Sequence, residues 1–355
     1  MKMAKREIKY FEAIREAINL SMQSDPMVYV MGLGVPDPKG IFGTTLGLQK
    51  EYGADRVMDM PCSENSMTGV AIGSALIGLR PILSHQRVDF AILSMEQIVN
   101  QAAKWHYMFA GQKCVPIVIR MLIGRGWGQG PQHAQSLESW FAHIPGLKVV
   151  APVTPYDAKG LLIMSIRDNN PVIFFEHRWL HNLTGEVPEY SYTVPIGKGN
   201  IVRAGSDVTI VTYSYMVIES LKAAGFLTRF GIDCEVIDLR SLRPLDSEII
   251  LASVRKTGHL VVVDNDWKTG GIGAEVVAIV AEHAIRYLKE SPRRIGFPEC
   301  PSPTSPALSA GFYLHADDIV KEVLSVMNHD IGGIEIPVMH SGPLDIPDAS
   351  FTGPF

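Results

Sequence analysis

Apolar residues alternate between helical and strand patterns along the first half of the chain. Apolar side chains at helical spacing predict a helix over residues 6–22, and the run 28–34 follows as a short buried strand that ends in glycines. The β-branched run 115–120 is typical of a strand buried in a parallel sheet. The same reasoning predicts helices over 42–53, 66–79, 91–110 and 156–166, and strands over 57–60, 80–83, 147–152 and 171–176. This alternation indicates a three-layer α/β domain with a parallel sheet between helices.

A second alternation begins after a segment without helical period. Residues 183–204 carry turn residues and short strands, which is typical of a connection between domains. Beyond it we predict strands over 208–213, 234–238 and 259–264, and helices over 216–230, 246–255 and 273–288. The end of the chain is rich in Gly and Pro, and we expect it to fold only against something else. The predicted organisation is a first α/β domain (1–185), a connection (186–204), a second and smaller α/β domain (205–330) and a C-terminal tail (331–355).

Length and charge narrow the classes of function. A chain of 355 residues suits two domains, because single cores stop growing at about 250–300 residues. With 46% hydrophobic and 19% charged residues, the chain is richer in apolar residues than a monomer requires, which indicates subunit interfaces. The net charge is −5 with Lys and Arg scattered, so we expect no nucleic-acid partner.

Two further absences bear on location. No apolar run reaches the roughly 18 residues that a membrane span needs, so we expect no membrane association. The four cysteines are widely spaced, show no metal-ligand spacing and occur in a chain without a recognisable signal peptide. We therefore expect a cytoplasmic protein.

Three residues attract attention as candidate chemistry. Glu64 stands where a strand end meets a helix start, and local sequence alone favours a helix cap there, because acidic residues stabilise helix N-termini. Phe90 taken alone would be an ordinary core residue. His133 follows the glycine-rich segment 124–130, which lets the backbone approach a ligand closely, and this context favours an active-site role.

The surrounding motifs change these odds. Five segments closely resemble the beta subunit of the decarboxylating component of 2-oxoacid dehydrogenases, the pyruvate, branched-chain and acetoin dehydrogenase family. They are 59–73, Leu79–Pro81, Asp89–Phe90, 97–104 and 130–136. The resemblance continues through 141–152, 155–161, 166–171, 238–245 and 267–275, and it covers about residues 6–327. It implies a transketolase-like pyrimidine-binding domain followed by a transketolase C-terminal-like domain, with thiamine diphosphate as cofactor.

Carried over to matching positions, the resemblance assigns roles to the three candidates. Glu64 becomes the carboxylate that hydrogen-bonds the ring nitrogen of the aminopyrimidine, where an acid favours the imino tautomer that removes the thiazolium proton. Phe90 matches the aromatic residue that packs against the pyrimidine ring. His133 matches a histidine at the substrate, which can donate a proton or bind a carboxylate or intermediate. His85 and His106 have weaker claims.

The resemblance also implies sites for ions. It aligns a carbonyl-rich turn with a structural potassium site of some members, and K⁺ is a hard cation that prefers oxygen ligands; the matching residues are Ile117, Ser165, Ile166, Asp168 and Asn170. Spacing alone could equally mark the C-terminus of a helix. The segment 124–130 does not fit the Gly-x-Gly-x-x-Gly dinucleotide fingerprint, so we reject a nicotinamide site. The turn 270–273 also joins a strand to a helix, but the family uses this domain for packing and partner contacts.

A missing motif predicts a partner. In this enzyme class a Gly-Asp-Gly run binds the diphosphate through a divalent metal, and no Gly-Asp-Gly occurs in this chain. We therefore expect an alpha subunit to supply Mg²⁺ and the diphosphate-binding half of the site, in an α2β2 heterotetramer. A lipoyl acyltransferase is a further expected partner.

The chain departs from the family pattern near the expected pocket. Family members commonly carry an acidic pair where this chain has Leu33 and Gly34, and an acidic plus aromatic pair where it has Ser84 and His85. Arg87 adds a cation. Trp127 enlarges the glycine-rich segment, and the tail from Met339 extends beyond the ordinary family end. We therefore hypothesise a more polar or anionic 2-oxo acid, or an acceptor other than a lipoyl arm.

The predicted function follows from these pieces. We expect the beta subunit of a thiamine diphosphate-dependent 2-oxo acid dehydrogenase, which decarboxylates a 2-oxo acid oxidatively, transfers the acyl group to a lipoyl or other acceptor, and is active only with its alpha subunit. One alternative is a ketol or acyl transferase of a biosynthetic pathway with the same cofactor. Another is a non-catalytic scaffold subunit, against which the joint presence of Glu64, Phe90 and His133 argues.

Overall fold

The computed structural model describes residues 6–125, 129–329, 336–340, 342–348 and 351. Contacts divide the chain into two compact units, one comprising Met1–Gly124 and Gln132–Ile196, the other Arg125–Pro131 and Gly197–Pro354. Arg125 and residues 129–131 thus belong to the second unit, although the sequence pattern places them inside the first predicted domain. Trp127 lies outside the described residues.

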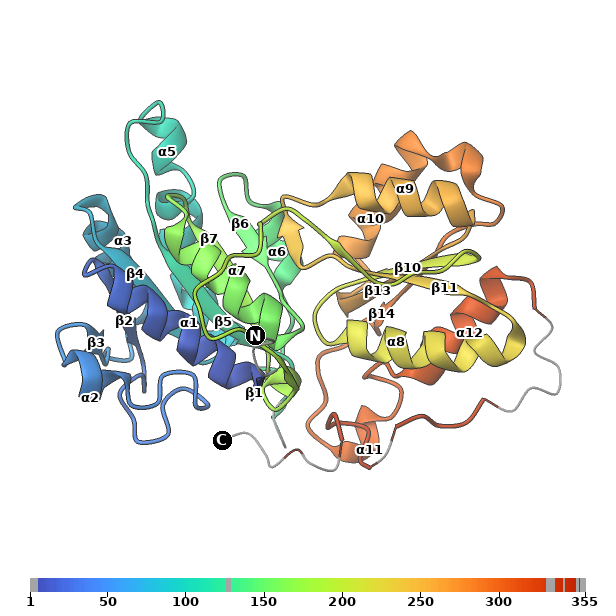
Figure 1. Ribbon diagram of the computed structural model, residues 1–355, viewed down its shortest axis with the longest axis horizontal. Coiled ribbons are helices and arrows are strands. Elements are labelled where there is room, and N and C mark those ends of the chain that lie inside the picture. Colours follow the sequence, from blue (N-terminus) through green and yellow to red (C-terminus); the bar gives the residue numbers. More distant parts are fainter. Residues whose placement is uncertain (1–5, 126–128, 330–335, 341, 349–350, 352–355) are drawn as a thin grey trace, which may run out of the picture. The chain divides into compact units, whose positions relative to one another are not determined.

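A parallel sheet forms the centre of the first unit (Figure 1). Its strands run in the order β6-β7-β5-β4-β2-β3, and each neighbouring pair is parallel. Every residue of β5 and β7 is buried, as expected for strands covered on both faces. The strand bounds are β2 Val28–Gly32, β3 Val57–Met58, β4 Arg80–His85, β5 Val118–Ile123, β6 Lys148–Val150 and β7 Val172–His177.

Two helices pack side by side against this sheet. Helix α1 (Tyr10–Ser24) buries one apolar face, and α7 (Pro155–Arg167) lies next to it (Figure 1). Helix α7 begins where its sequence predicts, because the Thr154 hydroxyl accepts a hydrogen bond from the Asp157 backbone N–H and proline occupies the first turn. The remaining elements are β1 (Glu7–Lys9), which pairs with β8 (Thr184–Glu186), α2 (Leu48–Tyr52), α3 (Glu64–Leu76), α6 (Glu138–His143) and η3 (Arg178–Leu180).

Two predicted helices are wrong in extent. Only Leu48–Tyr52 of the predicted helix 42–53 is helical, because Gly43 and Gly47 have φ of 84° and 77° and Phe42 has φ of 49°, which produces successive turns instead. The predicted helix 91–110 is broken into short pieces, including a π-helical segment of the kind often found at functional sites. The pieces are α4 (Val88–Ala91), η1 (Ile92–Ser94), η2 (Gln97–Ala102) and α5 (Trp105–Met108).

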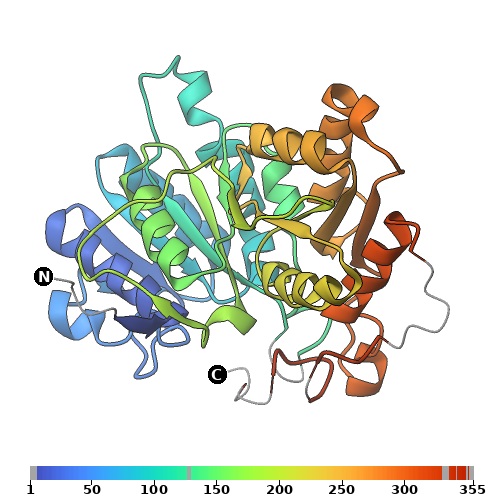
Figure 2. The same ribbon diagram turned by 45° about the vertical axis from the view of Figure 1, so that its right-hand side comes forward.

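The second unit repeats the α/β plan on a smaller scale. Its sheet has the order β14-β13-β10-β11-β9, parallel except for the edge strand β9. Helices α8 and α12 lie on one face, and α9 and α10 on the other (Figures 1 and 2). The bounds are β9 Asn200–Arg203, β10 Val208–Thr212, α8 Met216–Leu227, η4 Thr228–Phe230, β11 Cys234–Asp238, β12 Ser241–Arg243, α9 Ser247–Thr257, β13 Leu260–Trp267, α10 Ile272–His283, η5 Ile285–Tyr287, β14 Arg293–Phe297, α11 Pro306–Ser309 and α12 Ala316–Val326.

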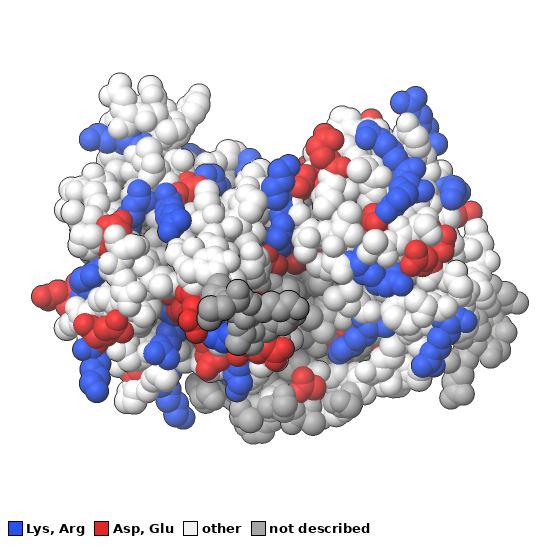
Figure 3. Space-filling model, in the orientation of Figure 1, with Lys and Arg blue, Asp and Glu red and all other residues white. Residues whose placement is uncertain are grey.

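The prediction of two α/β domains is therefore confirmed. On the face that Figure 3 displays, basic and acidic side chains are interspersed. Among the helices of the described residues, none combines the length and the apolar character needed to cross a bilayer.

Candidate active site

The carboxyl edge of the first sheet gathers the residues that the sequence singled out. Strands β2, β3, β4, β5 and β7 are parallel, so the segments that follow them leave the sheet at the same edge. Open parallel sheets bind ligands at this edge. The residues that follow the strand ends are Leu33 and Gly34, Asp59 and Glu64, Gln86 and Arg87, Gly124, and Arg178.

Glu64 is the first residue of α3 and is only 8% exposed. Among the described residues, no donor makes a hydrogen bond to its carboxylate, and Ser63 before it makes no side-chain cap. The helix dipole favours a carboxylate at this position, and the Glu64 oxygens are not among the fully buried polar atoms, so a ligand can reach them. Glu64 is therefore not accounted for as a hydrogen-bonding cap, and its environment fits a carboxylate that binds a ligand.

Phe90 and His133 lie together although 43 residues separate them in the chain. Their ring centroids are 5.2 Å apart and the rings meet edge to face at 86°. Phe90 is half-buried in α4, whereas His133 is exposed. One turn after Glu64, the Thr68 hydroxyl donates to the Ser94 hydroxyl at 2.9 Å, which ties the start of α3 to the segment that follows Phe90.

Asp89 is a functional candidate to which sequence reasoning gave no role. The Gln135 side-chain amide donates to Asp89 Oδ1 at 2.8 Å, so Asp89 fixes the segment that carries His133. Burial raises the pKa of Asp89, and the hydrogen bond from Gln135 and the charge of Arg87 oppose that rise. Its place beside Phe90 in a family motif was the only sequence signal for it.

Two guanidinium groups pack against one aromatic ring at the same edge. The Arg178 and Arg87 guanidinium carbons lie 4.8 Å and 5.8 Å from the centre of the Phe42 ring. Arg87 also donates to the Gly124 carbonyl oxygen at 2.6 Å. Burial lowers the pKa of Arg178 to about 10. A pocket of about 590 Å³ adjoins the ring and is lined by residues 37–42 and Gln86.

A buried ion pair supports this edge from within the sheet. Arg120 Nε donates to Glu176 Oε1 at 2.6 Å and Nη2 donates to Oε2 at 3.0 Å, with both side chains fully buried. Burial alone would raise the pKa of Glu176, but the Arg120 charge and the nearby His181 ring, 3.6 Å away, hold it at about 2. Arg120 also donates to the Ser84 hydroxyl at 3.2 Å, at one of the positions where the sequence departs from the family. Sequence reasoning missed this pair.

The two histidines with weaker claims occupy different environments. His85 is 2% exposed, and burial lowers its pKa to about 4. His106 is exposed in α5 and lies 3.6 Å from the Cys114 sulfur. Neither is brought to Phe90 by a contact among the described residues.

The predicted potassium ligands lie around one turn, and Arg80 already donates to two of them. Its Nη1 donates to the carbonyl oxygens of Ile166 and Asp168 at 3.0 Å and 3.1 Å, and Lys148 pairs with the Asp168 carboxylate. Asn170 N–H donates to the same carboxylate at 2.9 Å. Ser165 Oγ donates to the Leu161 carbonyl oxygen at 2.7 Å, and the carbonyl of Ile117 accepts from Val172 N–H at 3.0 Å. Potassium at this turn stays a prediction.

At the second glycine turn, residues 270–273, a side chain of the protein itself caps the N-terminus of helix α10. Both carboxylate oxygens of Asp264 accept from Gly273 N–H at 3.0 Å, at the start of α10. This is where a dinucleotide phosphate would bind in a dinucleotide-binding domain. The geometry is that of a structural cap. Within the described residues, His, Cys, Asp and Glu side chains form no group of three or more that could hold a metal ion.

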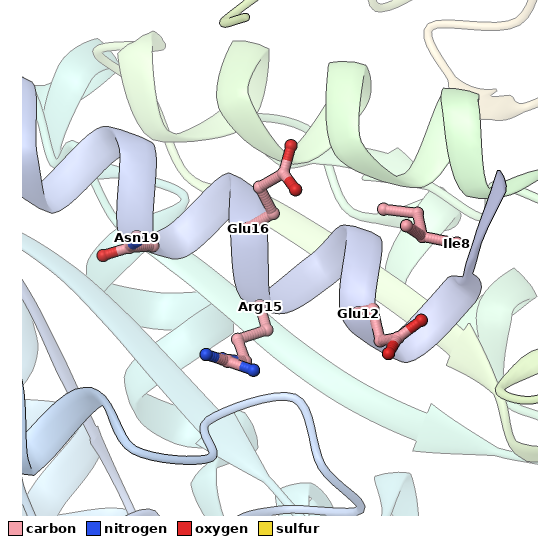
Figure 4. Close-up of a pocket in the computed structure, with 5 residues that line it drawn as sticks. All are labelled: Ile8, Glu12, Arg15, Glu16 and Asn19. Atoms are coloured by element: carbon pink, nitrogen blue, oxygen red, sulfur yellow. The ribbon is translucent and has the colours of Figure 1, made fainter. Parts of the chain in front are cut away.

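A second pocket, of about 250 Å³, lies beside α1, and the Glu16 carboxylate in its lining is already paired with basic side chains (Figure 4). Glu16 points from α1 toward α7, whereas Arg15 points to the opposite side. Arg6 and Lys159 both pair with the Glu16 carboxylate, which is thereby neutralised. The pocket lies away from the carboxyl ends of the strands; its lining is Ile8, Glu12, Arg15, Glu16 and Asn19.

Two family models match nearly the whole chain. "Transketolase, pyrimidine binding domain" matches residues 6–182, and "Transketolase, C-terminal domain" matches residues 197–319. A solved structure described as "Split gene transketolase, inactive beta4 tetramer" has a TM-score of 0.73 and 24% identity, and the match covers 90% of this chain and 98% of that one. At that identity the likeness shows the fold alone.

Three curated relatives define the family more narrowly. The beta subunit of acetoin:2,6-dichlorophenolindophenol oxidoreductase from Cupriavidus necator is 47% identical, covering 85% of this chain and 92% of the relative. Pyruvate dehydrogenase E1 component subunit beta-2 from Oryza sativa is 42% identical, covering 90% and 86%. The 2-oxoisovalerate dehydrogenase subunit beta from Bacillus subtilis is 41% identical, covering 88% and 96%. With this similarity and the two transketolase-like domains, the chain belongs to the family of E1 beta subunits of the 2-oxo acid dehydrogenases.

Proposed function

We propose that this chain supplies the pyrimidine-binding half of a thiamine diphosphate site, and that an alpha subunit supplies Mg²⁺ and the diphosphate-binding half in an α2β2 enzyme. The observation that carries the proposal is Glu64, a buried carboxylate without a hydrogen-bond donor among the described residues. A protonated ring nitrogen would satisfy that carboxylate. The four cysteines are free thiols, which fits an enzyme that works in the reducing cytoplasm.

Glu64 and Phe90 would hold the aminopyrimidine. Glu64 would keep a proton on the ring nitrogen through a charge-assisted hydrogen bond, and burial would strengthen that bond by excluding water. Phe90 would pack against the ring, since its own ring is half-buried and fixed edge to face by His133. Thiamine diphosphate supplies the electron sink for decarboxylation when it is bound.

His133 would act on the substrate side. Its imidazole is exposed, so it can reach a ligand, and its contact with Phe90 fixes one edge of the ring. The bond from Gln135 to Asp89 restrains the backbone two residues beyond it. His133 would then bind the substrate carboxylate or move a proton at a ring nitrogen.

We further propose that the substrate carries more negative charge than a plain aliphatic 2-oxo acid, or that the acceptor is not a lipoyl arm. Arg87 and Arg178 both pack on Phe42, which lines the 590 Å³ pocket. Gln86, which follows His85, donates to the Leu33 carbonyl oxygen at 3.0 Å, so the segment after β4 contacts one of the positions where an acidic residue was expected. The two guanidinium groups behind Phe42 and the Lys39 side chain in the lining would attract an anion, against the opposing charge of Asp37 in the same lining.

Calorimetric titration with thiamine diphosphate and Mg²⁺ tests the division of the site. The titrations use this chain alone, the alpha chain recovered with it by pull-down, and the reconstituted complex. We expect saturable binding in the micromolar range for the complex and at least about a hundredfold weaker binding for this chain alone, because it lacks the metal clamp. Equal Mg²⁺-dependent affinity of the isolated chain and the complex would contradict the proposal.

A further inference from the structure

Arg125, at the start of the glycine-rich segment that precedes His133, is completely buried. Its Nη1 donates to the Pro303 carbonyl oxygen at 2.7 Å and to the Ser309 hydroxyl at 2.8 Å. Its Nη2 donates to the Thr304 carbonyl oxygen at 2.7 Å. A buried guanidinium needs such a set of acceptors, and here they all belong to the second unit.

The C-terminal tail completes this set with a carboxylate. Asp345 Oδ2 lies 2.7 Å from Arg125 Nη2, and the two side chains are 5% and 0% exposed. Removing one partner of a buried ion pair leaves the other charge unpaired, so such pairs are expensive to break. Asp345 therefore links the tail to the second residue of the glycine-rich segment.

The other described end of that segment meets the same surface. A Cβ built on Gly130 would lie 2.1 Å from the Thr304 Oγ1 atom, so a larger residue here would displace the Thr304 side chain. Arg125 and Gly130 thus both rest on the 303–304 backbone or side chain. The two ends of the segment are held by one surface.

Further contacts fasten the tail beside Asp345. His315 Nε2 lies 3.2 Å from the Leu344 carbonyl oxygen, and the rings of His315 and His340 have centroids 4.4 Å apart. Ile346 is only 9% exposed. The tail was expected to fold only against something else, and its described residues contact the second unit of this same chain. The tail also lies beyond residue 319, where the second family model ends.

We propose that the described part of the C-terminal tail, residues 336–340 and 342–348, positions Arg125 and Gly130 of the glycine-rich segment through the Asp345–Arg125 pair. The consequence for catalysis rests on the proposed function, because His133 follows this segment by three residues. Asp345 is a positioning residue: it pairs with Arg125, Arg125 donates to the Thr304 carbonyl oxygen, and the Thr304 side chain lies against Gly130, three residues before His133. Releasing the tail should free that backbone and lower turnover without removing the cofactor-binding carboxylate.

Tryptic cleavage after Arg125 measures the clamp without any assay of activity. The chain is folded in complex with its alpha subunit, and cleavage of the 125–126 bond is followed by mass spectrometry. Asp345→Asn removes the charge, a stop after His329 removes the tail, and Asp345→Glu restores a carboxylate. The control Asp233→Asn breaks an exposed pair with Arg203 in the same unit. The thermal unfolding transition of each variant is recorded first.

We expect wild type and Asp233→Asn to resist cleavage, Asp345→Asn and the truncated chain to be cleaved at least about tenfold faster, and Asp345→Glu to regain protection. With pyruvate and 2,6-dichlorophenolindophenol as probes, kcat should fall about tenfold for Asp345→Asn with little change in KM. Unchanged protection in both Asp345→Asn and the truncated chain would overturn the proposal. If wild type does not oxidise pyruvate, the cleavage rates still decide it, so failure of the clamp and failure of the proposed function are distinguishable.

Discussion

His85 illustrates how a titratable side chain alters the electrostatics of a buried position. It is 2% exposed, and burial lowers its pKa to about 4. Among the described residues, its Nε2 atom makes no hydrogen bond. His85 is therefore neutral in the folded chain, whereas in the unfolded chain it takes up a proton as the pH falls below its usual pKa of about 6.5.

Replacing His85 with phenylalanine should make the fold less sensitive to acid. Because the folded pKa lies below the unfolded value of about 6.5, unfolding takes up a proton, and stability is lost as pH falls from about 6.5 to about 4. This linkage amounts to about 2 kcal/mol between pH 7 and pH 5. Urea unfolding at both pH values should show a pH difference smaller by that amount for His85→Phe. An unchanged difference would mean that His85 is solvated or already charged in the native state.

Single residues of the site divide into those that motifs predict and those that only the tertiary structure reveals. Glu64, Phe90 and His133 stand in family motifs, and the contact between Phe90 and His133 agrees with a shared site. Arg120 and Glu176 are 56 residues apart in the chain, and the local sequence around them does not indicate that they form a buried ion pair. Arg178 follows a strand end, and that position was the only signal available for it.

At the scale of elements, buried strands are easier to predict than helices. The strands of both sheets are nearly continuous apolar runs, which few other structures accommodate. The predicted helix 91–110 fails because tertiary contacts interrupt it: a Cβ on Gly146 would lie 1.9 Å from the Ala103 carbonyl oxygen, which shows how closely another segment approaches there. The spacing of apolar residues along the sequence gives no indication that the segment around Gly146 comes so close to Ala103.

Gly273 at the start of α10 should not tolerate alanine. Its Cβ would lie 2.4 Å from Asp264 Oδ2 and 3.1 Å from Val262 Cγ1, so the carboxylate that caps the helix would have to move. We expect Gly273→Ala to lower the free energy of unfolding by about 1–3 kcal/mol in urea titrations. Gly225→Ala in α8 is the matched control, because no atom lies within 4 Å of its Cβ position, and it should raise that free energy by about 0.5–1 kcal/mol. Equal effects of the two variants would show that crowding at Asp264 is not the cause.

At the scale of the whole molecule, the repeated alternation of strands and helices was enough to predict two α/β domains. It could not predict that Arg125 and residues 129–131 belong to the second unit, because the acceptors of Arg125 are contributed by residues 303–309 and 345. The partner chain is inferred from the missing Gly-Asp-Gly motif, and the fold of this chain alone gives no evidence for or against it. The proposed two-chain site therefore depends on Glu64 more than on any feature of the architecture.

Turnover of the Glu64→Gln variant in complex with the alpha chain is the most direct test of this account. The amide keeps the size of the side chain but cannot hold the proton on the ring nitrogen, so we expect decarboxylation to fall by at least about a hundredfold while assembly and unfolding temperature stay unchanged. Glu282→Gln, at an exposed acid, should retain full activity. Wild-type turnover by Glu64→Gln would contradict the central claim.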